Sequence, residues 1–256
     1  FHRAGGVPVL MANLAQRGLI FMDANPVYGS MEDYLTTPYL DDEQNLIFER
    51  VSESRDTSVL ADSQGCFSTS GGLKVLSGNL GRGVMKVSAV AEQHRKVVAP
   101  ARVFDSQHDV EAAYKRGQFT QDTVIVVRFN GPSANGMPEL HKLMPIMGNL
   151  MKSGLNVALV TDGRLSGASG KVPAVIHITP EANRGGLLAK LQDGDMIEVD
   201  GISGTVNVLV CVADRALHQP DLACSLIGSG RELFNVFRQS ISTAEQGASI
   251  LYSTTI

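Results

Sequence analysis

Two apolar runs, Val124-Ile-Val-Val127 and Val157-Ala-Leu-Val160, determine the fold that this sequence predicts. Each run is too continuous for a strand with one buried face and therefore indicates a strand buried on both faces. The residues between them favour a helix over about 139–153. Because strand, helix and strand at this spacing form a βαβ unit, we expect part of the sheet to be parallel.

The sequence on either side adds further elements. Ser106 is placed to cap a helix that ends at Gly117, and the helical period of residues 7–17 predicts another helix. Residues 36–65 are polar and lack sustained periodicity, so we interpret them as a connecting segment. Strands are predicted over 84–90 and 172–178, a hairpin-like pair over 196–199 and 206–210, and a last helix over about 231–239.

These elements predict a protein of the mixed α/β class, in which helices alternate with parallel and antiparallel strands. Periodicity leaves open whether the sheet is open or closed into a barrel. After the connecting segment the sequence changes from polar and aperiodic to a series of predicted strands and helices. This change predicts two parts, residues 1–65 and residues 66–256.

The composition argues against several classes of protein. The 256 residues carry a formal net charge of -4 with scattered basic residues, so no nucleic-acid partner is expected. No apolar run reaches the roughly 18 residues that span a bilayer, so no membrane partner is expected. The cysteines form no CxxC pair, which is typical of reduced thiols in a cytoplasmic protein. The chain opens at Phe1 without an initiator Met or a signal-peptide pattern, and we expect it to be part of a longer protein.

The run Val157-Ala-Leu-Val-Thr-Asp-Gly-Arg-Leu-Ser-Gly-Ala-Ser-Gly170 places several polar groups directly after a buried strand. Ligands of α/β sheets bind at the carboxyl ends of parallel strands, and glycines let backbone N–H groups approach an oxyanion closely. The candidate site residues here are Arg164, Ser166 and Ser169. The alternative is a plain turn whose Ser and Asp side chains satisfy their own backbone.

A second stretch, Gly131-Pro-Ser-Ala-Asn-Gly-Met-Pro-Glu139, follows the other buried strand. It brings Glu139 to the same end of the sheet as Ser166. The carboxylate is a candidate ligand for Mg²⁺, which takes oxygen ligands and needs only one or two from protein. Alternatively, Glu139 only stabilises a helix N-terminus, by about 0.3–1 kcal/mol.

Two other glycine-rich stretches could bind an anion. His2 precedes the pair Gly5-Gly6 at a predicted helix start, and Gly228-Ser-Gly-Arg231 opens the last predicted helix. The second stretch would suit a phosphate because Arg231 is at hand. For both stretches a simple capped helix start is the alternative.

Six motifs, taken together and in order, resemble the dehydratase family that includes the dihydroxy-acid, 6-phosphogluconate and aldonate dehydratases. They are His2-Arg-Ala-Gly-Gly6, Gly71-Gly-Leu-Lys74 with Gly78-Asn-Leu80, Pro100-Ala-Arg-Val-Phe-Asp105, Gly136-Met-Pro-Glu139, Thr161-Asp-Gly-Arg164 with Ser166-Gly167, and His177-Ile-Thr-Pro-Glu-Ala182. Residues 65–70, 166–173 and 230–234 are most similar to the branch that acts on 6-phosphogluconate. Ala168 stands where dihydroxy-acid dehydratases usually have a second glycine.

The resemblance implies a partly open β-barrel of the swivelling β/β/α type with flanking helices, preceded by the last helices of a cluster-binding N-terminal domain. It implies the loss of water from 6-phospho-D-gluconate, giving 2-dehydro-3-deoxy-6-phosphogluconate in the Entner–Doudoroff route. It also implies Mg²⁺, an iron–sulfur cluster of the 4Fe-4S type whose ligands lie outside this chain, and a homodimer. The chain alone is therefore expected to be inactive.

The same resemblance assigns roles to individual residues. Ser166 matches the family's catalytic serine, an alkoxide base whose hydroxyl needs nearby metal charge to lower its pKa. Glu139 matches a carboxylate ligand of Mg²⁺. Arg164, Ser169 and Lys171 are the nearest candidates for binding substrate hydroxyls or phosphate, and surface salt bridges are the alternative for them. Two other functions stay open: a related dihydroxy-acid or aldonate dehydratase, and a binding or assembly module without chemistry.

Overall fold

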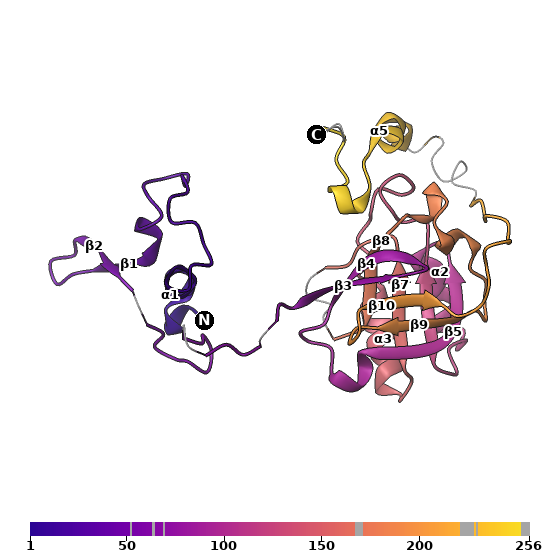
Figure 1. Ribbon diagram of the computed structural model, residues 1–256, viewed down its shortest axis with the longest axis horizontal. Helices are drawn as coiled ribbons and strands as arrows, with labels where there is room; N and C mark the ends of the chain where they lie inside the picture. Colours follow the sequence, from indigo (N-terminus) through magenta and orange to yellow (C-terminus); the bar gives the residue numbers. More distant parts are fainter. Residues whose placement is uncertain are drawn as a thin grey trace. The chain divides into compact units, whose positions relative to one another are not determined.

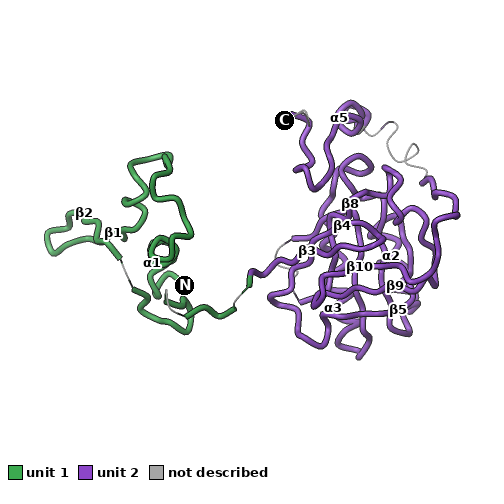
Figure 2. Tube along the Cα trace, in the orientation of Figure 1, with its two compact units in different colours: residues 1–70 green, residues 71–256 purple. Residues whose placement is uncertain are grey.

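The computed structural model describes residues 1–51, 53–62, 65–68, 70–166, 171–220, 228 and 230–251. The chain divides into two compact units, residues 1–70 and residues 71–256 (Figure 2). This division falls a few residues after the boundary expected between residues 65 and 66. Each unit has a buried apolar cluster of its own.

Unit 1 combines a helix with a two-stranded antiparallel hairpin. The helix confirms the prediction over 7–17, and its Val9 packs with Ala4 and Leu60 in a small buried cluster. The hairpin was not predicted, because most of its side chains are exposed on both faces and no apolar–polar alternation marks its strands. The elements are α1 (Gly6–Gln16), β1 (Thr36–Leu40) and β2 (Leu46–Arg50).

Unit 2 is built around a β-barrel, which confirms the mixed α/β class and the expected architecture (Figure 1). The barrel is closed, whereas the resemblance implied a partly open one. The strands follow the order β10-β3-β4-β8-β7-β6-β5-β9 around it. The barrel closes between β10 and β3 through one registered pair, Thr205 with Ser77. The strands are β3 (Leu73–Gly78), β4 (Gly81–Lys86), β5 (Lys96–Phe104), β6 (Thr123–Val127), β7 (Val157–Thr161), β8 (Ala174–Thr179), β9 (Met196–Asp200) and β10 (Thr205–Val208).

The parallel strands β5, β6, β7 and β8 explain the two continuous apolar runs. Val124 and Val126 of β6 belong to the cluster inside the barrel, whereas Ile125 and Val127 belong to a second cluster outside it. That outer cluster includes residues of α2 (Gln107–Lys115) and α3 (Leu143–Lys152). Because both faces of β6 and β7 are covered, neither strand alternates with polar residues.

Two helix predictions for unit 2 differ in their outcome. Ser106 caps α2 as predicted, since its hydroxyl accepts a hydrogen bond from the backbone N–H of Asp109. Helix α3 begins at Leu143 and not near residue 139, because Glu139 forms an isolated parallel bridge with Arg164. The residues after α3 then lead directly into β7.

The C-terminal part of unit 2 is a series of short helical turns. They are η7 (Arg231–Phe234), α5 (Asn235–Ser240) and η8 (Ala244–Gln246). Contacts between η8 and β8 hold this part against the barrel. Over the described residues, none of the helices combines the length and the apolar character that crossing a bilayer requires.

Candidate functional site

Polar residues gather where the parallel strands β6 and β7 end. The segment after β6 runs from Arg128 to Glu139, and the segment after β7 begins with Asp162. The two strands are parallel and in register, with Val127 opposite Thr161. Both segments therefore leave the barrel at the same end, where α/β proteins bind ligands.

Glu139, Arg164 and Ser166 meet in this region, as the sequence predicted. The Glu139 Oε2 atom lies 2.7 Å from the Arg164 Nη1 atom in a salt bridge. The Glu139 Oε1 atom accepts a hydrogen bond of 2.6 Å from the backbone N–H of Ser166. Arg164 also donates from Nε to the carbonyl of Met137 at 2.7 Å. One carboxylate thus links the segments that follow β6 and β7.

Asp162 links these segments through hydrogen bonds to their backbone. Its carboxylate is fully buried and accepts hydrogen bonds from the backbone N–H groups of Phe129, Asn130 and Ala182, at 3.1, 2.9 and 2.9 Å. Burial raises the pKa of Asp162 to about 6, although the three N–H donors favour the charged carboxylate. The residue connects the ends of β6 and β7 with the segment after β8, so it fixes the backbone around Glu139 and Ser166.

Two further residues support the same end of the barrel. Glu181 is buried and accepts hydrogen bonds from the backbone N–H of Ser133 at 3.2 and 3.1 Å. His177 has a left-handed φ of 59° and donates from its backbone N–H to the carbonyl of Gly163 at 2.9 Å. Burial, together with the nearby charge of Arg164, lowers the pKa of His177. No role had been assigned to Asp162, His177 or Glu181 from the sequence.

Of the other two predicted substrate residues, only Lys171 is among the described residues. Ser169 falls outside the described residues. Lys171 is exposed at the start of the segment that leads into β8. The side chains of Arg164 and Ser166 are exposed as well, so solvent and ligands can reach them.

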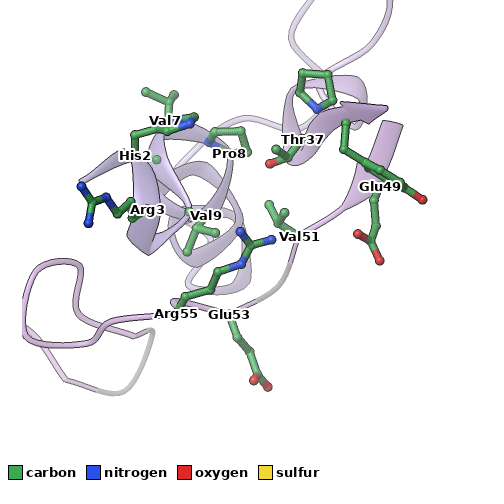
Figure 3. Close-up of a pocket in the computed structure, with 14 residues that line it drawn as sticks. His2, Arg3, Val7, Pro8, Val9, Thr37, Glu49, Val51, Glu53 and Arg55 are labelled. Atoms are coloured by element: carbon green, nitrogen blue, oxygen red, sulfur yellow. The ribbon is translucent and has the colours of Figure 1, made fainter. Parts of the chain in front are cut away.

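The two remaining glycine-rich stretches lie outside this group. In unit 1, His2, Arg3 and the Gly5-Gly6 pair line a pocket of about 840 Å³ (Figure 3). Glu49, Glu53 and Arg55 also line it, so its charges are mixed and do not single out an anion. Near the C-terminus, the backbone N–H of Gly228 donates to the carboxylate of Glu232. This contact favours the capping alternative for that stretch, because an internal carboxylate occupies the N–H donor.

Glu139 also has the chemistry of a ligand for a hard cation. Each carboxylate oxygen uses one acceptor position for Arg164 or Ser166, and a carboxylate offers about four such positions. The described residues contain no group of three or more His, Cys, Asp or Glu side chains that could hold a metal ion. Both oxygens of Glu139 therefore keep acceptor positions that a hard cation can use.

The sequence is similar to proteins of known activity. The family profile described as dihydroxy-acid/6-phosphogluconate dehydratase C-terminal matches residues 58–248. The chain is 52% identical over 255 residues to phosphogluconate dehydratase of Escherichia coli K12, and 49% identical over 252 residues to that of Pseudomonas aeruginosa. It is 32% identical over 251 residues to dihydroxy-acid dehydratase of Solidesulfovibrio magneticus. These alignments cover 98%, 97% and 96% of this chain, but only 42%, 41% and 42% of the relatives.

Proposed function

Since this chain belongs to the dihydroxy-acid/6-phosphogluconate dehydratase family, we propose that the complete protein dehydrates 6-phospho-D-gluconate to 2-dehydro-3-deoxy-6-phosphogluconate, the dehydration of the Entner–Doudoroff route. The observation that carries this proposal is the meeting of Glu139, Arg164 and Ser166 at one end of the barrel. The higher identity to the two phosphogluconate dehydratases than to the dihydroxy-acid dehydratase supports the phosphorylated substrate.

Ser166 is the proposed base. Dehydration breaks the C2–H bond and the C3–O bond of the sugar acid, and the resulting enol rearranges to the 2-keto acid. As an alkoxide, the exposed side chain of Ser166 would take the C2 proton, and the C3 hydroxyl would leave as hydroxide, so that the proton and the hydroxide together are lost as water. The hydrogen bond from the backbone N–H of Ser166 to Glu139 fixes the position of the residue. The buried carboxylate of Asp162 keeps the surrounding backbone in place.

Arg164 and Lys171 are the proposed cationic contacts for the substrate, with Ser169 beside them in the sequence. Arg164 is partly neutralised by Glu139, so its remaining N–H donors would orient an anionic or hydroxyl oxygen and add little net charge. Lys171 is exposed and would attract a phosphate as a point charge. This division of roles assigns the phosphate to Lys171 and the orientation of the acid to Arg164.

The family's chemistry depends on metal. Glu139 would hold Mg²⁺, and the cluster ligands would come from outside this chain. Cys66 and Cys211, which are exposed free thiols among the described residues, are not assigned to the cluster. Bound Mg²⁺ and the iron–sulfur cluster would supply Lewis-acid assistance, which acidifies the C2 proton and weakens the C3–O bond. A cytoplasmic location and a homodimer remain predictions from the sequence.

The decisive assay compares two substrates with the complete protein. We expect turnover of 6-phosphogluconate with a kcat/KM at least about 100-fold above that of 2,3-dihydroxyisovalerate, because a site built for a phosphate loses that contact with the second substrate. The reverse preference would assign the chain to the dihydroxy-acid branch. Turnover of neither substrate by the metal-loaded protein would instead favour the non-catalytic alternative.

A further inference from the structure

A small recess opens at the rim of the barrel between β4, β8 and η8. Its volume is about 150 Å³. Three lining residues carry polar side chains: Arg82 on β4, His177 on β8 and Glu245 on η8. Val75, Val84 and Ala244 supply apolar surface around them. A recess with both kinds of surface resembles a ligand site in its chemistry, because it combines apolar contact with a few directed polar groups.

The recess is adjacent to the candidate site because His177 belongs to both. Val160 of β7 pairs with Val175 of β8, so Asp162 and His177 follow at the same end of the barrel. The backbone N–H of His177 donates to the carbonyl of Gly163, the residue before Arg164. Arg164 is also close enough for its positive charge to act on the imidazole.

The wall of the recess contributed by η8 is anchored to the barrel at two points. Arg82 Nη1 and Glu245 Oε1 form a salt bridge of 3.1 Å. Arg184, which follows β8, donates to the carbonyl of Ile241 just before η8. Within the turn, Thr243 and Gln246 form a capping box. The C-terminal segment therefore completes a defined pocket and does not merely pass over it.

The charges of the recess indicate what it can bind. Arg82 and Glu245 neutralise each other, and burial with the nearby Arg164 favours the neutral form of His177. The recess thus offers N–H donors and carboxylate and imidazole acceptors without net charge. Such a set suits alcohol hydroxyls, which donate and accept at once, better than a carboxylate or a phosphate.

The backbone conformation of His177 also supports the interpretation of the recess as a ligand site. A non-glycine residue with a left-handed φ of 59° is uncommon, and strain of this kind gathers at ligand sites. The recess, at about 150 Å³, is smaller than the roughly 300–1,000 Å³ of typical ligand pockets, so it suits part of a hydroxylated carbon chain better than a whole phosphorylated acid.

We propose that this recess binds the hydroxylated carbon chain of the sugar acid, and that His177 and Glu245 are residues that determine specificity for it. The proposal rests on the proposed function, because it names a second contact for the same substrate. It assigns to the C-terminal segment a direct part in recognition of the hydroxyl groups beyond C3.

The test uses Glu245→Gln and His177→Asn in the complete protein. Asparagine tolerates a left-handed φ better than most residues, so the second variant should keep the backbone of β8. We expect the KM for 6-phosphogluconate to rise about tenfold in each variant, while kcat stays within about twofold. Glu245→Gln replaces a charge-assisted hydrogen bond to the substrate by a weaker neutral one, and His177→Asn shortens the side chain that would reach the substrate. Glu198→Gln, which removes a comparable 2.9 Å salt bridge to Lys96 between β9 and β5, is the matched control and should leave KM unchanged.

Direct binding separates this inference from the proposed function. Calorimetry should show that both variants bind D-gluconate about tenfold more weakly than the unaltered protein, but bind D-glycerate, which lacks the longer hydroxylated chain, equally well. Equal weakening for both acids, or no weakening for D-gluconate, would overturn the recess as a hydroxyl site even if 6-phosphogluconate is turned over normally. A protein that binds D-gluconate in this way but dehydrates nothing would support the recess and refute the proposed function.

Discussion

The carboxylate of Glu139 lies 2.6 Å from the backbone nitrogen of Ser166, although 27 residues separate them in the sequence. The contact joins the segment after β6 to the segment after β7. Arg164 donates a hydrogen bond to the other oxygen of the same carboxylate. Because both strands are parallel, their carboxyl ends must lie together, and the loops need only close a short gap. This geometry gives Glu139 two distinct tasks that can be tested separately: positioning Ser166 and binding a cation.

Replacing Glu139 by glutamine should separate these tasks. The amide oxygen of Glu139→Gln can still accept the hydrogen bond from Ser166, but the negative charge beside Arg164 is lost. We expect the Mg²⁺ concentration that gives half-maximal activity to rise at least about tenfold, because a neutral amide is a poorer ligand for a hard cation. Glu111→Gln, which removes an exposed salt bridge to Lys115, is the control and should not change it. An unchanged Mg²⁺ requirement in Glu139→Gln would show that this carboxylate holds no cation.

Replacing Ser166 by alanine tests the proposed base. In the complete protein, Ser166→Ala should lower kcat by about 10²–10⁴-fold, the usual contribution of a general base, with KM nearly unchanged. The backbone N–H that bonds to Glu139 remains, so the variant should keep the link between the segments after β6 and β7. Ser203→Ala, in the exposed turn between β9 and β10, should retain full activity. Near-normal kcat in Ser166→Ala would instead support the binding-module alternative.

The sequence predicted the parts of the fold that leave a local pattern. The runs at β6 and β7 were found because burial on both faces makes their apolar character continuous, and the Ser106 cap was found because its partner Asp109 is only three residues away. The hairpin of β1 and β2 was missed because its side chains are largely exposed and show no periodicity. Closure of the barrel depends on contacts between β3 and β10, which lie far apart in the sequence, and periodicity cannot indicate such contacts.

The part of the candidate site that could be predicted consists of residues that directly follow the ends of buried strands. Glu139, Arg164 and Ser166 were identified because each follows a buried strand within a glycine-rich loop. Asp162 stands in the same loop, yet its structural role was not evident. Its side chain accepts hydrogen bonds from backbone N–H groups 20 to 33 residues away. Because a backbone N–H can belong to almost any residue type, the partners of Asp162 leave no mark in the sequence. Only the assembled barrel shows that it connects three segments.

The buried carboxylate of Asp162 should make stability depend on pH. Its pKa of about 6 exceeds that of an unfolded aspartate, so between these values the folded protein holds a proton that the unfolded chain has released. Stability from this group therefore falls as pH rises from about 4 to about 6, by up to about 3 kcal/mol. In Asp162→Asn this contribution disappears, while the side-chain NH₂ faces a backbone donor at a cost of about 1–3 kcal/mol.

Urea unfolding of both proteins at several pH values measures the difference. The stability lost in Asp162→Asn should be largest near pH 4 and should shrink by up to about 3 kcal/mol as the pH rises through 6. Other titrating groups cancel in this comparison because both proteins share them. A difference that is constant across this range would mean that the pKa of Asp162 is the same in the folded and unfolded states.

The closure of the barrel should depend on the small size of Gly78, the last residue of β3. A Cβ atom at this position would overlap the carbonyl oxygen of Val206 on β10. The next residue, Asn79, exchanges two hydrogen bonds of 2.8 Å with the backbone of Val208, so a displaced β10 would lose them as well. We expect Gly78→Ala to lower the free energy of unfolding by about 1–3 kcal/mol, as overpacking usually does.

Gly148→Ala is the matched control: it lies on α3 with no atom within 4 Å of the added Cβ, and it should leave stability unchanged or raise it by up to about 1 kcal/mol. Thermal unfolding checks both values, and equal midpoints for the two variants would show that the seam between β3 and β10 adapts without cost.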